Sequence, residues 1–326
     1  MKRVILVLTA LCLMACCVAA EGGTEKQSAV GFYFDTVVTL TAYVTDASVL
    51  DQALAECDRY EKLLSKTVEG SDVWNINHAQ GAPVQVSDET IEILNCALQV
   101  GQMSGGAFDI TIAPVSALWD FTSGAAVLPD AEAIQRAAAL VDYTQVRIEG
   151  NTVTLPAGMQ IDLGGVAKGY IADGVKHYME GLGVKSAILS FGGNIVAIGL
   201  KPDGSVWRVG IQDIDQPTGN YMLVSVNRGG STVTSGIYER GFDLDGVRYH
   251  HILDPDTGYP VQNELASVTI FSESSMWGDA LATAAFALGR EKGAEFIEGI
   301  ENAEALFIAR DRSVTYTSGA LEYMDQ

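Results

Sequence analysis

A strand-to-helix turn with two adjacent glycines, IDLGGVAKGY at residues 161–170, is the feature that most restricts how this chain can fold. An apolar strand ends at the carboxylate of Asp162, and Lys168 falls on the first turn of the helix that follows. Glycines let the backbone approach a ligand closely, and the unpaired N–H groups of a helix start favour an anion such as phosphate. The alternative is a tight turn in which Asp162 satisfies backbone N–H groups and Lys168 is solvated.

Strands and helices do not alternate strictly along the rest of the chain. The segment 31–44 is rich in β-branched and aromatic residues and predicts a long strand or a hairpin arm, whereas helices are expected at 88–103, 275–288 and 290–299. The 326 residues are 48% hydrophobic, which is enough for one large core or two fused smaller ones. We therefore predict an α+β fold rather than a doubly wound parallel sheet.

The charge balance excludes some classes of partner. The formal net charge is −21, so the chain lacks the clustered lysines and arginines that hold nucleic acid or anionic lipid without sequence preference. If a phosphate binds to such an acidic protein, a metal ion or local donors must assist.

The N-terminus has the features of an export signal. Lys2 and Arg3 precede an apolar run that is too short to span a membrane and ends in small residues. The end of this run, LMAC, is similar to a bacterial lipobox, which predicts lipidation of Cys16, with Cys17 as the next candidate. Ordinary cleavage near residues 19–20 is the alternative.

These features divide the chain into three parts. We expect a lipoprotein signal peptide at 1–15, a lipidated N-terminus and polar tether at 16–30, and a folded domain at 31–326. The expected location is the extracytoplasmic side of a bacterial cell membrane, with contact to the membrane only through the lipid.

Two cysteines, Cys57 and Cys96, lie in the folded part, on apolar faces of expected helices. Their number and spacing give no metal site. Buried free thiols are the favoured interpretation, and a disulfide between them remains open.

Two further segments combine residues that can carry chemistry. YHHILDPDTGYP at 249–260 holds two histidines beside carboxylates, which could be a base, a ligand or a hydrogen-bonded loop. In WGDALATAAFALG at 277–289, Asp279 and Thr283 are four residues apart and share one face of a helix. A carboxylate and a hydroxyl are hard oxygen ligands suited to Mg²⁺, although such a pair can also be only a capping or hydrogen-bonded pair.

Taken together and in order, these segments resemble the ApbE family, the FAD:protein FMN transferases. The resemblance covers about residues 31–310, nearly the whole folded part. The matching motifs are FDT, SGGAFDITIAP with Trp119, IDLGGVAKGYIAD, LSFGGNIVAIG, TSGIYER, HHILDPDTGYPV and GDALATAAFALG. It implies an α+β body that is a duplicated T-fold-like unit, with FAD in a cleft between the two halves and a divalent metal at its diphosphate.

The resemblance also implies roles for single residues. FAD contacts are expected at Ala107, Phe108, Asp109, Asp162, Lys168 and Leu253. Metal ligands are expected at Asp279, Thr283 and the carbonyl of Gly165, with Mg²⁺ as the ion and Mn²⁺ as an alternative. His251 is expected to be the base for the acceptor hydroxyl and Asp279 to be essential for catalysis; a carboxylate such as Asp254 would be the substitute base.

The implied reaction passes the FMN moiety of FAD to a threonine or serine hydroxyl of a target flavoprotein and releases AMP. The expected acceptor is a membrane electron-transfer subunit. Two alternatives stay open: a metal-dependent FAD pyrophosphatase that yields FMN and AMP, and a flavin-binding lipoprotein without catalytic activity. The chain departs from the family pattern at Phe34-Asp35-Thr36, where Met-Gly-Thr is usual, and at Gly278, where alanine is usual.

Overall fold

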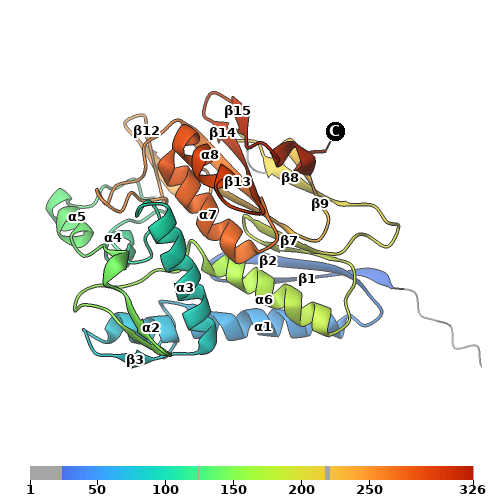
Figure 1. Ribbon diagram of the computed structural model, residues 1–326, viewed down its shortest axis with the longest axis horizontal. Helices are drawn as coiled ribbons and strands as arrows, with labels where there is room; N and C mark the ends of the chain where they lie inside the picture. Colours follow the sequence, from blue (N-terminus) through green and yellow to red (C-terminus); the bar gives the residue numbers. More distant parts are fainter. Residues whose placement is uncertain (1–23, 124, 217–220, 326) are drawn as a thin grey trace, which may run out of the picture.

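The computed structural model describes residues 24–123, 125–216 and 221–325, and its centre is one eight-stranded sheet (Figure 1). The strand order is β1-β2-β6-β7-β10-β13-β14-β15, and neighbouring strands are antiparallel. These strands are β1 Glu25–Tyr33, β2 Thr36–Val44, β6 Ala187–Phe191, β7 Asn194–Ile198, β10 Ser231–Gly236, β13 Leu265–Ser272, β14 Ala303–Ala309 and β15 Val314–Tyr316.

The helices divide between the two halves of the sheet and an insertion, the segment 65–166 between α1 and α6. The long ones are α1 Ser48–Leu64, α3 Asp88–Met103, α6 Ala167–Gly181, α7 Ser275–Leu288 and α8 Arg290–Glu298. The short ones are α2 Asp72–His78, α4 Ala113–Ser116, α5 Ala131–Ala138 and the 3-10 turns η1 Tyr143–Gln145 and η2 Ala320–Tyr323. Small sheets are formed by β3 Val84–Gln85, β5 Thr152–Thr154 and β4 Arg147–Glu149, by β8 Trp207–Gln212 and β9 Tyr221–Asn227, and by β11 Gly241–Leu244 and β12 Val247–His250.

One topology occurs twice along the chain. The first half runs β1, β2, helices beginning with α1 and ending with α6, then β6 and β7; the second runs β10, β13, α7, α8, then β14 and β15. In both halves the four strands lie side by side in chain order. The α+β prediction is confirmed, and this repeat is the duplication that the resemblance implied.

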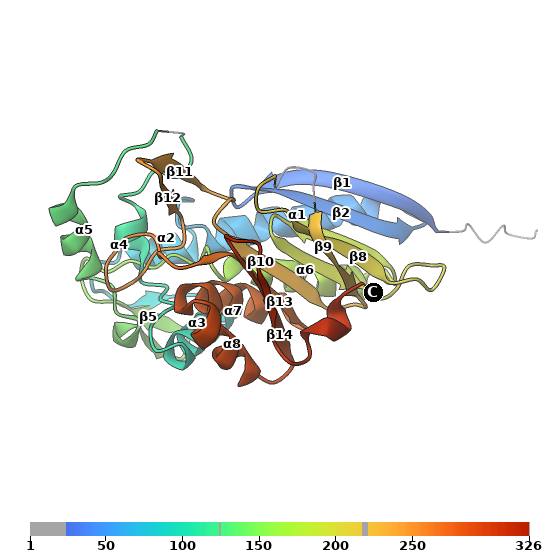
Figure 2. The same cartoon turned by 90° about the horizontal axis from the view of Figure 1, so that it is seen from above.

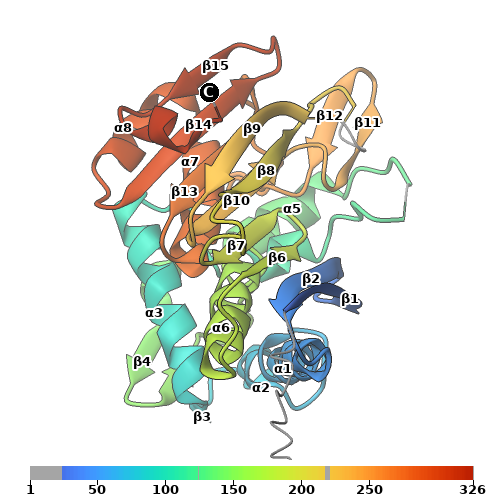
Figure 3. The ribbon, with the colours of Figure 1, turned by 90° about the vertical axis from the view of Figure 1, so that its right-hand side faces the viewer.

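Both faces of the sheet are covered around β13, as Figure 3 shows. Val268 and Ile270 belong to the main core with residues of α7, whereas Phe271 packs with Leu306 and Ile308 in a separate cluster that includes Ile211 of β8. Alternate side chains of a strand point to opposite faces, so α7 lies on one face and the β8–β9 ribbon on the other.

Residues 31–44, expected to form one long strand or a hairpin arm, form the end of β1, a turn at 34–35 and β2, and β1 begins earlier than expected. The strand starts at Glu25, so residues 25–30, which we expected in the tether, pair with β2 in register from Val44. Pairing satisfies their backbone groups, which outweighs the polar composition that suggested a tether. Phe34 and Asp35 have φ of 52° and 55°, the left-handed conformation of a two-residue hairpin turn, and this accounts for glycine being usual at position 35.

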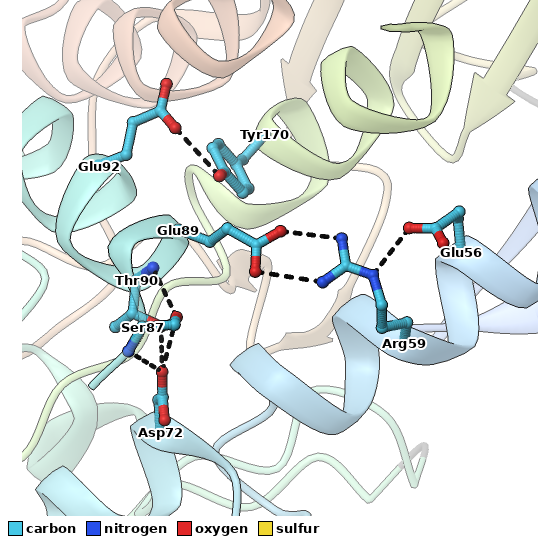
Figure 4. A network of polar contacts seen from close by, with 8 residues as sticks. All are labelled: Glu56, Arg59, Asp72, Ser87, Glu89, Thr90, Glu92 and Tyr170. Carbon is cyan, nitrogen blue, oxygen red and sulfur yellow. Dashed lines mark hydrogen bonds and ion pairs between the residues drawn. The ribbon is translucent and has the colours of Figure 1, made fainter. Parts of the chain in front are cut away.

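A polar network ties the insertion to the helical layer (Figure 4). Arg59 of α1 pairs with Glu89 of α3 at 2.8 Å. Asp72 accepts from the backbone and the hydroxyl of Ser87, at 2.9 and 2.8 Å, at the start of α3. Arg59 of α1 and Asp72 of α2 therefore both hold the start of α3.

Some predictions concern residues outside the described ranges. The predicted signal peptide at 1–15 and the predicted lipidation site, Cys16, lie there. Within the described residues, no helix combines the length and the apolar character needed to cross a bilayer. Cys57 and Cys96 are buried free thiols, as the favoured interpretation predicted.

Candidate active site

The two halves of the fold meet where the start of α6 packs against α7, which Figure 1 shows side by side. A Cβ atom at Gly169 would lie 2.1 Å from the carbonyl oxygen of Ser275, so only glycine allows this approach. Asp173 of α6 accepts from the hydroxyl of Ser274 at 2.8 Å and from the N–H groups of Ser275 and Met276 at 2.9 and 3.0 Å. These bonds satisfy the first amides of α7 and fix its position against α6.

This packing brings Lys168 and Asp279 together, as the candidate site requires. Asp279 is 2% exposed, and its carboxylate accepts from the N–H of Gly169 at 3.0 Å. The Lys168 ammonium lies 3.2 and 3.4 Å from the two carboxylate oxygens and donates to the carbonyl of Gly164 at 3.2 Å. A buried carboxylate is stable only when it is paired in this way.

One turn further along α7, Thr283 faces Gly165 and β10. Its hydroxyl lies 3.5 Å from that of Ser235 and 3.5 Å from the position that a Cβ of Gly165 would take. The ring of Phe108 closes the same space, at 3.0 Å from that position. Glycine at 165 therefore leaves room between Phe108 and Thr283.

The oxygen groups between the start of α6 and α7 are of the kind that binds a magnesium ion. They are the carboxylate of Asp279, the hydroxyl of Thr283 and the backbone of Gly165, all hard oxygen groups. In the described ranges, no cluster of three or more histidine, cysteine or acidic side chains could hold a metal. A site with a single carboxylate would complete its shell with water and substrate phosphates, which is the usual arrangement for Mg²⁺.

The helix start offers fewer free amides than the sequence predicted. The N–H of Gly169 donates to Asp279, and that of Ala167 donates to the carbonyl of Leu163 at 2.7 Å. The Lys168 ammonium lies at this turn, and it is paired with Asp279.

Asp162 lies on the other side of the same turn and has two partners that the sequence did not indicate. Its carboxylate accepts from Lys66 at 2.5 Å, from Ser116 at 3.1 Å and from the N–H of Gly164 at 2.9 Å. Burial tends to raise the pKa of Asp162, but the Lys66 charge and these hydrogen bonds outweigh it and lower the pKa. Lys66 is 96 residues away in sequence, and no local spacing relates the two.

The two histidines have different surroundings. His250 is buried, its ring Nε2 donates to the carbonyl of Val261 at 2.9 Å, and burial lowers its pKa to about 4. His251 is exposed, next to the β11–β12 hairpin that stands apart from the main sheet (Figure 2). Loss of hydration among the surrounding atoms lowers the pKa of His251, and Arg240 and Lys168 add to this. His251 is thus neutral and accessible, which suits a base.

Two predicted FAD contacts, Asp109 and Leu253, and the substitute base Asp254 are fixed by interactions within the protein. Asp109 is buried and accepts from the N–H and hydroxyl of Thr111 at 2.7 and 2.6 Å and from the N–H of Tyr143 at 2.8 Å. Leu253 packs in an apolar cluster with Trp119. Asp254 accepts from two following backbone N–H groups, at 2.9 and 3.3 Å, and so forms a turn.

Of the remaining predicted contacts, Ala107 is half-buried in the loop before Phe108. Two hollows, of 310 and 340 Å³, lie beside α5 and between α3, the start of α7 and residues 299–303. Neither is lined by a predicted site residue, so the candidate site is identified by its convergent polar groups and not by cavity size.

Comparisons with known proteins find relatives over most of the chain. The model of the ApbE family matches residues 34–307. The FAD:protein FMN transferase of Klebsiella pneumoniae (strain 342) is 36% identical over 289 residues, 86% of this chain and 88% of the relative. The enzyme of the same name from Treponema pallidum (strain Nichols) is 37% identical over 293 residues, 84% of this chain and 81% of the relative.

The crystal structure of the ApbE protein of Thermotoga maritima superposes with a TM-score of 0.85 and 28% identity, covering 93% of this chain and 100% of that one. The range matched by the family model, residues 34–307, contains every candidate site residue from Ala107 to Thr283. By its motifs, its repeated sheet topology and these relatives, the chain belongs to the ApbE family.

Proposed function

We propose that this protein transfers the FMN moiety of FAD to a threonine or serine hydroxyl of a target flavoprotein and releases AMP. The observation that carries the proposal is the meeting of Asp279 and Thr283 with Gly165 and Lys168 at the junction of the two halves. The names of the relatives, FAD:protein FMN transferase, support the same reaction.

In the proposed reaction, the acceptor oxygen attacks the phosphorus of the FMN moiety. A new phosphoester bond forms, the bond from this phosphorus to the bridging oxygen breaks, and AMP leaves with that oxygen. Negative charge grows on the phosphoryl oxygens and the leaving group. The Lys168 ammonium, next to Asp279, is placed to stabilise that charge.

Asp279, Thr283 and the Gly165 carbonyl would hold Mg²⁺, with Mn²⁺ as an alternative. When bound, the ion neutralises phosphate charge and orients the diphosphate. His251 would take the proton of the acceptor hydroxyl, since its imidazole is neutral and exposed. Phe108, Ala107, Asp109, Asp162 and Leu253 are proposed to line the FAD site.

We also propose that Cys16 carries the lipid anchor and that the protein acts outside the cytoplasmic membrane on a membrane electron-transfer subunit. The support for this is the lipobox-like LMAC and the export signal. A Cys16→Ala variant should appear in the soluble fraction of cells that retain the unchanged protein in the membrane.

The activity is tested by incubating the protein with FAD, Mg²⁺ and a candidate acceptor flavoprotein. A covalent FMN adduct on the acceptor, found by intact mass and mapped to a threonine or serine, supports transfer. Free FMN with unlabelled acceptor would support the pyrophosphatase, and FAD that stays intact would support a binding protein without catalytic activity.

A further inference from the structure

Lys66 contacts the candidate site through Asp162. It lies in none of the sequence motifs, and the proposed reaction gives it no role. It lies between α1 and α2, and its ammonium contacts the Asp162 carboxylate at 2.5 Å and the Ser116 hydroxyl at 3.5 Å. Three segments that are far apart in sequence therefore converge on one carboxylate.

The backbone around Lys66 is held in place. The hydroxyl of Ser71 donates to the carbonyl of Ser65 at 2.5 Å, and the hydroxyls of Ser65 and Thr67 lie 3.0 Å apart. Ser71 also caps α2 by accepting from the N–H of Trp74 at 2.9 Å. Lys66 is thus presented to Asp162 from a fixed loop, and the ammonium and carboxylate side chains are only 38% and 21% exposed.

The pairing matters because of the charge near the turn. Asp162 and Lys168 both bind the backbone of Gly164, since Asp162 accepts from its N–H and Lys168 donates to its carbonyl. An unpaired carboxylate here would repel a diphosphate held by Lys168, and the rest of the protein is strongly acidic. The Lys66 ammonium offsets the negative charge of Asp162 next to the position proposed for the diphosphate.

We infer that Lys66 is a positioning residue for FAD: it orients and neutralises Asp162, so that Asp162 can accept a hydrogen bond from an uncharged O–H or N–H group of FAD without repelling the diphosphate. This inference rests on the proposed function, because it takes FAD as the ligand. It assigns to Lys66 a role exerted through Asp162 and not through direct contact with phosphate.

A double-mutant cycle on the full chain distinguishes a role of Lys66 through Asp162 from direct contact of Lys66 with phosphate. The affinities for FAD and for riboflavin are measured by titration. Lys66→Met should weaken FAD binding about tenfold or more, and riboflavin binding less, because riboflavin lacks the diphosphate. In an Asp162→Asn background, Lys66→Met should change FAD affinity by less than about twofold, since the carboxylate charge is already absent. Lys66→Arg, which keeps the cation, should restore most of the affinity.

Lys62→Met is the matched control. Lys62 lies one turn earlier, on α1, and pairs with the exposed Asp58 at 2.6 Å, so its replacement removes the same charge without affecting Asp162. Its FAD affinity should equal that of the unchanged protein. Thermal unfolding monitored by circular dichroism shows that each variant is folded before its affinity is compared.

Three results would overturn the inference: no loss in Lys66→Met, an equal loss in Lys62→Met, or a full loss from Lys66→Met in the Asp162→Asn background. The last result would show direct contact of Lys66 with FAD. These outcomes differ from failure of the proposed function, in which the unchanged protein would not bind FAD or would not label the acceptor.

Discussion

At the residue scale, the site combines one buried carboxylate, one hydroxyl and one ammonium from two helices. Asp279 accepts from Gly169 and pairs with Lys168, so its charge is held in a low-dielectric position next to the glycine-rich turn. Such preorganised groups contribute most when charge develops in the transition state.

Replacing Asp279 should remove catalysis and spare the fold. Asp279→Asn keeps the shape and can still accept from Gly169, but it loses the charge that a divalent ion needs. We expect FMN transfer to fall by at least about 10²-fold, measured by mass of the acceptor, with an unchanged circular dichroism spectrum. Thr283→Ala should behave similarly. The exposed Asp58→Asn is the control, and full transfer by Asp279→Asn would contradict the assignment.

The surroundings of His251 predict the pH dependence of transfer. Its pKa is lowered, so the neutral imidazole persists when the pH falls through the ordinary histidine value of about 6.5. The single-turnover rate should therefore stay level between pH 7.5 and roughly 6 and fall only at lower pH.

A substitution tests the same residue. His251→Gln should slow transfer about 10²–10⁴-fold and change FAD affinity much less. His250→Gln is the contrasting variant, since His250 is buried and bonded to Val261, and it should mainly lower stability. Unchanged turnover in His251→Gln would exclude His251 as the base.

At the element scale, the contact between α6 and α7 determines whether the site forms. Gly169 allows the two backbones to touch, and Asp173 caps α7 from α6. The sequence predicted both helices, one after the glycine-rich turn and one at 275–288. The sequence did not reveal that Gly169 allows α6 to pack against α7, because nothing near residue 169 in the sequence indicates which helix it contacts.

The glycines of α6 provide a matched pair of variants. Gly169→Ala would place a Cβ 2.1 Å from the carbonyl of Ser275, so the helices must separate, at a cost of about 1–3 kcal/mol in unfolding free energy. Gly181→Ala has no neighbouring atom within 4 Å and should be neutral or stabilise by up to about 1 kcal/mol. Urea unfolding of both proteins gives the comparison, and equal stabilities would contradict this account of the packing.

At the scale of the whole molecule, the site joins two halves that repeat one topology. The first half contributes the turn before α6, and the second half contributes α7. A ligand that binds across this junction stabilises the folded state through both halves.

Ligand-induced stabilisation should therefore depend on both FAD and Mg²⁺. At one hundred times the dissociation constant, FAD should add about 2.7 kcal/mol to the free energy of unfolding, seen as a higher melting temperature. EDTA should remove part of this gain in the unchanged protein and none in Asp279→Asn, because that variant cannot hold the ion. The same EDTA effect in both proteins would place the metal elsewhere.

The sequence by itself determined the local structure and the pairs that local geometry controls. The bounds of α3 and α7, the strand character of 31–44 and the common face of Asp279 and Thr283 follow from helical and strand periodicity, which acts over a few residues. The lack of strict alternation between strands and helices indicated the α+β class, and the family resemblance added the duplication.

Only the tertiary structure decided which distant groups meet. Lys168 pairs with Asp279 across 111 residues and Lys66 with Asp162 across 96, while His250 is buried and its neighbour His251 is exposed. These outcomes depend on how the two halves of the sheet and the insertion pack together. Packing energies arise between segments far apart in the chain, so no short stretch of sequence contains them.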